Sequence, residues 1–418
     1  MSIYEHLGIE EKGDLERLEM ALDGMDDEAL MRKLEARRGK GRNDYPVRVI
    51  WNLLIAMTVF GHRSIESFRR ELWRNAQLRR TCGLCDWARK RHMVPPARVF
   101  SGFLRLLAEE REELERVFEM TVEELVELLP EFGKHLAGDG KYLDSYAKRP
   151  AKDGSSETDR RTENDAEYSI KKYRYTGSDG KEHEKKETHY GFKAHLICDV
   201  PTELPIAYDV TAGNASEREK MIELVGALPE PLARRAESLA LDRGYDSAGM
   251  IRAVKSRGIC PVVDIRNCWK DGEATKQYKD TDMVYNHRGE VYICKGNGEL
   301  AKMKYEGYDR NKNCLRYSHE GKVRKIYISY DERIFLPIAR DSAKFKKIYK
   351  GRTSVERLNG RLDRDFMFED HCIRGLDKMR TRVTLSLITM NALAVSKLRR
   401  GVKKGLAAMT QTGLPPAA

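Results

Sequence analysis

The sequence predicts an α/β protein in which helices flank a mixed sheet, with an all-helical N-terminal domain and a β-rich insertion. Three observations predict this class. Residues 1–130 have helical periodicity, residues 135–264 alternate strand and helix patterns, and residues 267–333 hold short runs of Tyr and Val punctuated by glycines. Strands that alternate with helices bury their apolar faces by forming a sheet covered by helices.

Composition narrows the class of partner. The chain has 418 residues, 40% of them hydrophobic, and a formal net charge of +11. A basic balance favours a polyanion, which is DNA, RNA or an anionic membrane. The longest apolar run, 51–60, is half the roughly 20 residues of a membrane span, and no secretory signal begins the chain. We therefore expect a cytoplasmic, nucleoid-associated protein with no membrane partner.

The N-terminal region, 1–130, is expected to bind DNA. Residues 46–60 form an apolar helix, and Ser64 suits the N-cap of the next one. That second helix has one buried stripe, formed by Ile65, Phe68 and Leu72, and basic residues beside it, namely Arg69, Arg70 and Arg74. A pair of helices with one Arg-rich member suits DNA binding, and the alternative is a solvated basic face. The lone CxxC pair, Cys82 and Cys85, supplies too few ligands for zinc.

The central region, 131–266, begins with a strand over 136–146. Residues 148–187 are dense in charge and predict a long exposed loop. Strands over 189–200 and 204–211 follow as a hairpin, and then come a helix (216–228), a strand (236–241), a helix (247–256) and a strand (259–264). After the insertion, 267–333, helices return over 334–400 and complete this second domain. Residues 401–418 are expected to be a flexible tail.

Two aspartates stand out by context. Asp139 lies inside the first strand, where a buried carboxylate is costly unless it is paired or binds a metal ion. Asp242 follows the end of a short buried strand, and strand ends are where ligand sites form in α/β sheets.

Glu356 is the third candidate acid. With about 100° per residue, one face of its helix is apolar, formed by Ile348, Val355, Leu358, Leu362 and Phe366. A second face is polar and carries Tyr349, Arg352, Glu356 and Asp363. Periodicity alone also fits an ordinary surface helix with an Arg352–Glu356 ion pair.

Together these residues resemble the DDE transposases of bacterial insertion sequences, in particular the group with a Tyr-Arg-Glu-Lys signature. The resemblance rests on Asp139, on Leu-Asp-Arg-Gly-Tyr-Asp around Asp242, and on Tyr349-x-x-Arg352-x-x-x-Glu356. The stretches 189–195, 211–214 and 258–263 also resemble that group, so the likeness spans nearly the whole chain. One position departs from it: Asp363 stands where the signature has Lys, with Arg361 and Arg364 beside it.

The resemblance implies an RNase H-like catalytic domain that cuts and joins DNA at transposon ends. Asp139, Asp242 and Glu356 would hold two Mg²⁺ ions, for which Mn²⁺ can substitute. The partners would be the terminal inverted repeats and target DNA, bound by a homodimer. Further DNA contacts are expected from Tyr349, Arg352, Arg361, Lys193, Arg243 and Tyr245, the last by stacking on a base. Lys141 lies beside Asp139 and would help to hold the backbone.

Two other functions fit the same residues. An RNase H-like nuclease that only hydrolyses DNA would use the same three acids. A transposase-derived DNA-binding protein would have lost catalysis, against which the retention of all three acids argues. For His195, packing inside a strand is favoured over a role as metal ligand.

Overall fold

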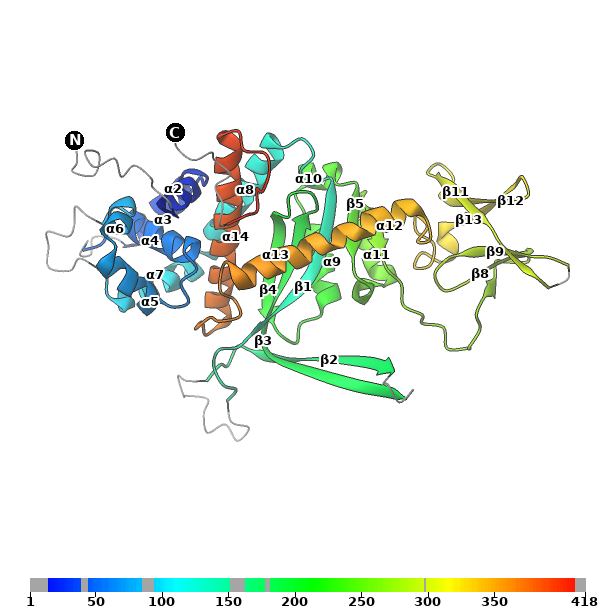
Figure 1. Ribbon diagram of the computed structural model, residues 1–418, viewed down its shortest axis with the longest axis horizontal. Coiled ribbons are helices and arrows are strands. Elements are labelled where there is room, and N and C mark those ends of the chain that lie inside the picture. The colour runs from blue at the N-terminus through cyan, green and yellow to red at the C-terminus, as the bar shows by residue number, and fades with distance from the viewer. Residues whose placement is uncertain are drawn as a thin grey trace.

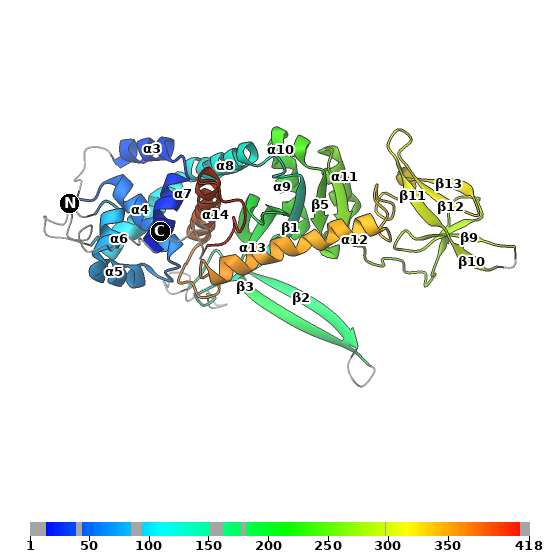
Figure 2. The ribbon, with the colours of Figure 1, turned by 45° about the horizontal axis from the view of Figure 1, so that its top comes forward.

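The computed structural model describes residues 14–38, 44–84, 94–150, 162–176, 181–296 and 298–409. Its fold is mixed α/β, with one large sheet and two small sheets in these residues. The molecule is elongated: helices preceding the first strand lie at one end, the large sheet lies in the middle, and the small sheets lie at the other end (Figures 1 and 2).

The helices before the first strand pack through apolar faces. Ser64 caps α5 as expected, because its Oγ accepts a hydrogen bond from the Ser67 N–H at 3.1 Å. Cys82 is buried, and Cys85 lies outside the described residues. The helices are α2 (Asp14–Asp23), α3 (Glu28–Arg38), α4 (Val47–Val59), α5 (Ile65–Arg74), α6 (Ala76–Thr81), α7 (Ala97–Glu109) and α8 (Arg111–Leu128).

The large sheet has the order β2-β3-β1-β5-β6, and β4 also pairs with β3. β1 runs antiparallel to β3 and parallel to β5, and β5 runs parallel to β6. The strands are β1 (His135–Asp144), β2 (Glu167–Thr176), β3 (Glu182–Asp199), β4 (Pro205–Ala212), β5 (Ser238–Leu241) and β6 (Cys260–Val263). The helices between them are α9 (Glu217–Ala227), α10 (Glu230–Arg235), η2 (Arg243–Tyr245) and α11 (Ala248–Ser256).

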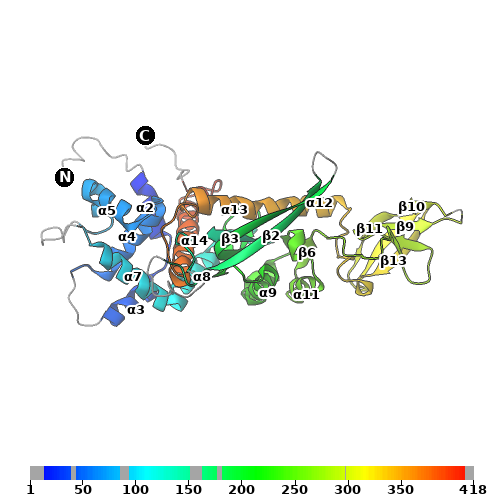
Figure 3. The same cartoon turned by 90° about the horizontal axis from the view of Figure 1, so that it is seen from below.

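Helices cover both faces of this sheet (Figure 3). α9 and α11 lie on one face, and α12 (Ala343–Tyr349), η4 (Lys350–Arg352) and α13 (Thr353–Arg364) lie on the other. The backbone at Gly351 approaches the end of β3 so closely that a Cβ there would lie 2.8 Å from Val200. Ser354 donates a hydrogen bond to the Val200 carbonyl at 2.8 Å, which fixes α13 against the sheet.

The last helix, α14 (Leu376–Arg399), lies between the early helices and the large sheet and contacts both. It packs against α2, α4, α7, α8 and β4, so that one apolar core runs from the early helices to the sheet. Residues 401–409 follow it and pack down, because Leu406 and Met409 are apolar and the buried Lys397 ammonium donates to the Gly405 and Ala408 carbonyls. The flexible tail expected from residue 401 is therefore packed as far as residue 409, and residues 410–418 lie outside the described residues.

The prediction of an exposed loop over 148–187 is wrong for much of this range. Residues 167–176 and the first part of β3 pair as a long antiparallel hairpin that projects from the sheet (Figures 1 and 2). Because the projecting part of β3 is exposed on both faces, no apolar alternation marks it in the sequence. Residues 151–161 and 177–180 lie outside the described residues.

The residues expected to form a β-rich insertion fold into two small sheets with an apolar core of their own. One sheet has the order β10-β9-β8-β7 and the other β11-β12-β13. An ion pair at 3.0 Å between Arg333 and the buried Asp246 ties this part to the large sheet. The elements are β7 (Lys276–Gln277), β8 (Met283–Tyr285), β9 (Val291–Cys294), β10 (Leu300–Lys302), β11 (Lys304–Asp309), β12 (Cys314–His319), β13 (Lys322–Tyr327) and η3 (Ile328–Tyr330). Among the described residues, no helix is long and apolar enough to cross a bilayer.

Candidate active site

Asp139 and Asp242 come together through strand register. β1 and β5 are parallel neighbours, and their last aligned pair is Gly138 with Leu241. The next residue on each strand is one of the two aspartates, and the backbone at Asp242 is still extended. Adjacent strands are about 4.8 Å apart, so the sheet sets the two aspartates side by side. The Asp242 Oδ1 also accepts a hydrogen bond from the Gly244 N–H at 2.6 Å.

The electrostatics of Asp139 reflect this proximity. Burial raises the pKa of the Asp139 carboxyl to about 6, and the negative charges of Asp242 and Glu217 add to the rise. A hydrogen bond from the Gly140 N–H and the positive charge of Arg352 act in the opposite direction on this pKa. Perturbed acids gather at functional sites, which makes this pair the centre of the candidate site.

Strand alternation decides which helix Asp139 faces. Side chains two residues apart lie on the same face of a strand, so Asp139 and Lys141 share a face. The Lys141 Nζ forms an ion pair at 2.6 Å with Asp363 of α13, and both side chains are mostly buried. Asp139 therefore faces α13. Asp363, which stands where the family signature has Lys, therefore has Lys141 of β1 as its ion-pair partner.

Glu356 lies on this same helix, between Arg352 and Asp363. Its Oε1 forms an ion pair at 2.6 Å with the Arg352 guanidinium, and about half of its side chain is exposed. In the described part of the chain, no three His, Cys, Asp or Glu side chains gather closely enough to hold a metal ion. The structure thus joins the two aspartates, and it places Glu356 on the adjoining helix with Arg352 as its partner.

The opposite face of β1 carries a second polar cluster that the sequence did not reveal. A Cβ on Gly140 would lie 3.2 Å from the Glu217 carboxyl group of α9. The Glu217 Oε1 accepts a hydrogen bond from the Tyr142 hydroxyl at 3.0 Å and pairs with the Lys193 ammonium at 3.2 Å. Glu217 lies in the first turn of a helix, where acids are common, so its sequence context gives no signal.

Two expected DNA contacts lie in or beside this covered cluster. Lys193 is buried, and besides Glu217 it donates to the Ala215 carbonyl at 3.1 Å. Tyr245 is 1% exposed and lies beside Gly140 on the α9 face, so its ring has no surface open to a base. Neither residue can reach DNA in this conformation, because proximity to an aspartate along the chain does not determine which face a side chain takes.

His195 is packed, as favoured from the sequence. It is fully buried in β3, and its Nε2 lies 3.0 Å from the Thr211 Oγ1. Burial lowers the pKa of His195 to about 4, helped by the positive charge of Lys193.

The remaining expected contacts differ in accessibility. Arg243 is exposed next to Asp242, and Tyr349 is half-buried and stacks on Phe345 with ring centroids 5.7 Å apart. Arg361 pairs with Glu203 and is mostly buried, so a phosphate would have to displace Glu203. The helix α5 lies on the far side of α14 from β1 and β5 (Figures 1 and 2). Arg69 pairs with Glu66, Arg74 pairs with Glu71, and Arg70 is exposed.

Comparison with known proteins assigns a family. The family described as "Transposase DDE domain" matches residues 157–392, which is more than half of the chain. The chain therefore belongs to the DDE-domain transposases. The match contains Asp242 and Glu356 and begins after Asp139.

Among solved structures, the chain is similar to piggyBac transposase in a synaptic complex with hairpin DNA. The likeness covers 97% of this chain and 80% of that one, with 10% sequence identity and a TM-score of 0.39. So low a TM-score adds nothing to the family assignment. No curated protein matches the chain.

Proposed function

We propose that the protein cuts and joins DNA at transposon ends, with an RNase H-like sheet as its catalytic platform. The observation that carries the proposal is the pairing of Asp139 and Asp242 at adjacent positions of neighbouring parallel strands. Membership of the DDE transposase family supports the reaction class. By the resemblance to insertion-sequence transposases, two copies of the chain would bind the two DNA ends.

The two aspartates fit a divalent cation. Their carboxylates offer the hard oxygen ligands that Mg²⁺ prefers. Asp139 is difficult to ionise because of its burial and the charge of Asp242, and a cation would relieve both effects. When bound, the metal would stabilise charge on the attacking and leaving oxygens of the phosphodiester.

Glu356 is our candidate for the third ligand. Asp139 faces α13, and Glu356 lies in the chain between Arg352, whose charge acts on Asp139, and Asp363, which pairs with Lys141. Glu217 is less suitable, because it lies on the α9 face of β1 and is engaged by Tyr142 and Lys193.

Arg352 would position Glu356 according to whether DNA is bound. Without DNA, the Arg352 guanidinium pairs with Glu356 at 2.6 Å. A backbone phosphate competes for the same guanidinium, which binds phosphate through two parallel hydrogen bonds. Transfer of Arg352 to phosphate would free the Glu356 carboxylate to act together with Asp139 and Asp242. Binding of DNA and completion of the acidic site would then be coupled.

Nicking of supercoiled DNA in Mg²⁺ tests this assignment. We expect Glu356→Gln to reduce nicking by orders of magnitude while DNA binding survives, because the residue lies outside the apolar face of α13. Glu217→Gln is the matched control, since it removes the same charge on the other face of β1. Equal nicking by Glu356→Gln and wild type would exclude Glu356 as third acid, and loss only in Glu217→Gln would transfer the role to α9.

A further inference from the structure

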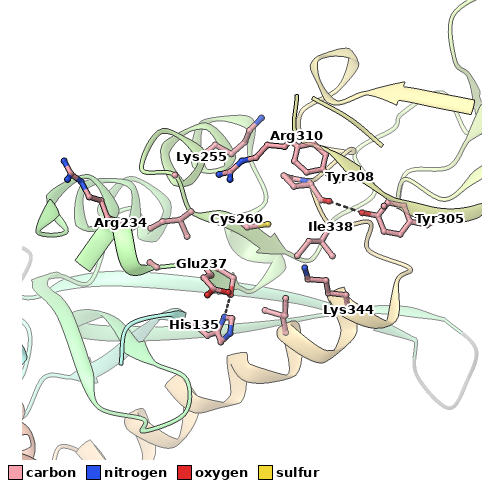
Figure 4. Close-up of a pocket in the computed structure, with 17 residues that line it drawn as sticks. His135, Arg234, Glu237, Lys255, Cys260, Tyr305, Tyr308, Arg310, Ile338 and Lys344 are labelled. Atoms are coloured by element: carbon pink, nitrogen blue, oxygen red, sulfur yellow. Dashed lines mark hydrogen bonds between the residues drawn. The ribbon is translucent and has the colours of Figure 1, made fainter. Parts of the chain in front are cut away.

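A cavity of about 750 Å³ lies at the edge of the large sheet where β1, β5 and β6 begin (Figure 4). Its lining includes the first residues of β1, β5 and β6, which are His135, Ser238 and Cys260. Four residues along each strand separate His135 from Asp139 and Ser238 from Asp242, which is about 13 Å. The far wall comes from β11, so the cavity lies between the large sheet and the small sheets.

The lining of this cavity is basic. Lys255, Arg310 and Lys344 contribute to it, and within the described residues none of the three forms an ion pair. Lys255 and Lys344 both lie close enough to act on the Cys260 thiol. Burial raises the pKa of this thiol to about 11, and the positive charges of the two lysines act in the opposite direction. Glu237 is the single acid of the lining, and Arg234, the fourth cation, pairs with Glu230 outside it. Three cations without a paired protein anion give the cavity a positive potential that attracts an anionic ligand.

Two aromatic rings complete the lining. Tyr305 and Tyr308 are three residues apart on β11, and in a regular strand they would lie on opposite faces. The pairing of β11 with β12 shifts between Tyr305 and Gly307, which inserts one residue into β11. Such a bulge re-aims the side chains beyond it, and both tyrosines line the cavity. Their hydroxyls are held by the Pro337 carbonyl at 3.1 Å and by the Asn313 Oδ1 at 2.9 Å.

We propose that this cavity binds a single strand of DNA, with phosphates against Lys255, Arg310 and Lys344 and a base against the tyrosines. Cations that track a backbone beside aromatic rings that stack bases are the general form of a single-strand site. A sphere of this volume would be about 11 Å in diameter. A duplex is too wide to enter, because its major groove alone spans about 12 Å. The inference rests on the proposed function in that DNA is the expected substrate.

The test is fluorescence anisotropy of labelled twelve-nucleotide thymidine DNA in EDTA, which removes catalysis from the measurement. We expect Lys255→Gln/Arg310→Gln/Lys344→Gln to weaken binding and to reduce the slope of log affinity against log salt by about 2, because each single-strand contact contributes about 0.7. Lys312→Gln/Lys322→Gln/Lys325→Gln removes the same charge from exposed positions of the small sheets and should leave both values unchanged. Tyr308→Leu should weaken binding roughly 5- to 150-fold.

A second readout uses the wild-type protein and does not depend on the folding of variants. Cys260 lines the cavity and Cys294 is exposed elsewhere, so the same oligonucleotide should slow alkylation of Cys260 at pH 9 and not that of Cys294. Equal affinities of the two triple variants, or no protection of Cys260, would overturn the proposal. The proposal would also be overturned if the cavity triple variant lost duplex binding to the same extent, or if inorganic phosphate alone protected Cys260. If no DNA is nicked and yet Cys260 is protected, the proposed reaction fails while this site stands.

Discussion

Replacing Asp139 by Asn should stabilise the metal-free protein at neutral pH and have little such effect in acid. Burial and the charge of Asp242 raise the pKa of this carboxyl from 3.8 to about 6. The rise corresponds to about 3 kcal/mol at most. The folded state holds the proton more tightly, so the wild type loses this stability as the pH rises from about 4 through 6. An Asn side chain cannot ionise and loses nothing over the same range.

The assay is thermal unfolding in EDTA from pH 4 to pH 8. The melting temperature of Asp139→Asn relative to wild type should increase from about pH 4 to about pH 7 and stay level above that. Asp144→Asn, at the exposed end of the same strand, should show no such increase. Addition of Mg²⁺ at pH 7.5 should stabilise the wild type and not Asp139→Asn. A difference that is flat with pH, or that decreases above pH 4, would refute the argument from burial and Asp242.

Three further predictions concern cations. Arg352→Ala should weaken binding to transposon ends in a gel-shift assay while nonspecific nicking in Mn²⁺ persists, and loss of both would make Arg352 necessary for the site itself. Asp363→Lys, which introduces the residue of the family signature, should lower the melting temperature because it opposes Lys141, and Lys141→Asp/Asp363→Lys should recover most of it; no recovery would mean that the pair is not coupled. Neutralising Arg69, Arg70 and Arg74 together should weaken end binding and its salt dependence, and unchanged values would assign them to a solvated surface.

Much of α13 was predictable because one of its faces is buried, and much of the sheet because strands such as β5 and β6 are short runs of buried residues. Val355, Leu358 and Leu362 repeat at helical spacing, and their burial follows from that spacing. The turn between β3 and β4 has its own local signal in Pro201 to Glu203. The β2–β3 hairpin has no such pattern in β3, because the projecting part of this strand is exposed on both faces.

The candidate site was predictable only in part, because it depends on faces and register. The motif around Asp242 gave its place at a strand end, and parallel register then joined it to Asp139. Lys193 and Tyr245 belong to stretches that resemble the family, and yet they lie on or beside the face of β1 that α9 covers. The basic cavity unites strand starts with a bulged strand that follows them in the chain, so no local sequence pattern could indicate it.

A strand-transfer assay with a pre-cut transposon end tests the central claim most directly. The ends would be taken from inverted repeats flanking the coding sequence and incubated with target plasmid in Mg²⁺. We predict that the wild type joins the 3′-ends to the plasmid, and that Asp139→Asn and Asp242→Asn bind the ends and join none. Hydrolysis without joining by the wild type would indicate a nuclease, and joining by either Asn variant would contradict the role of the paired aspartates.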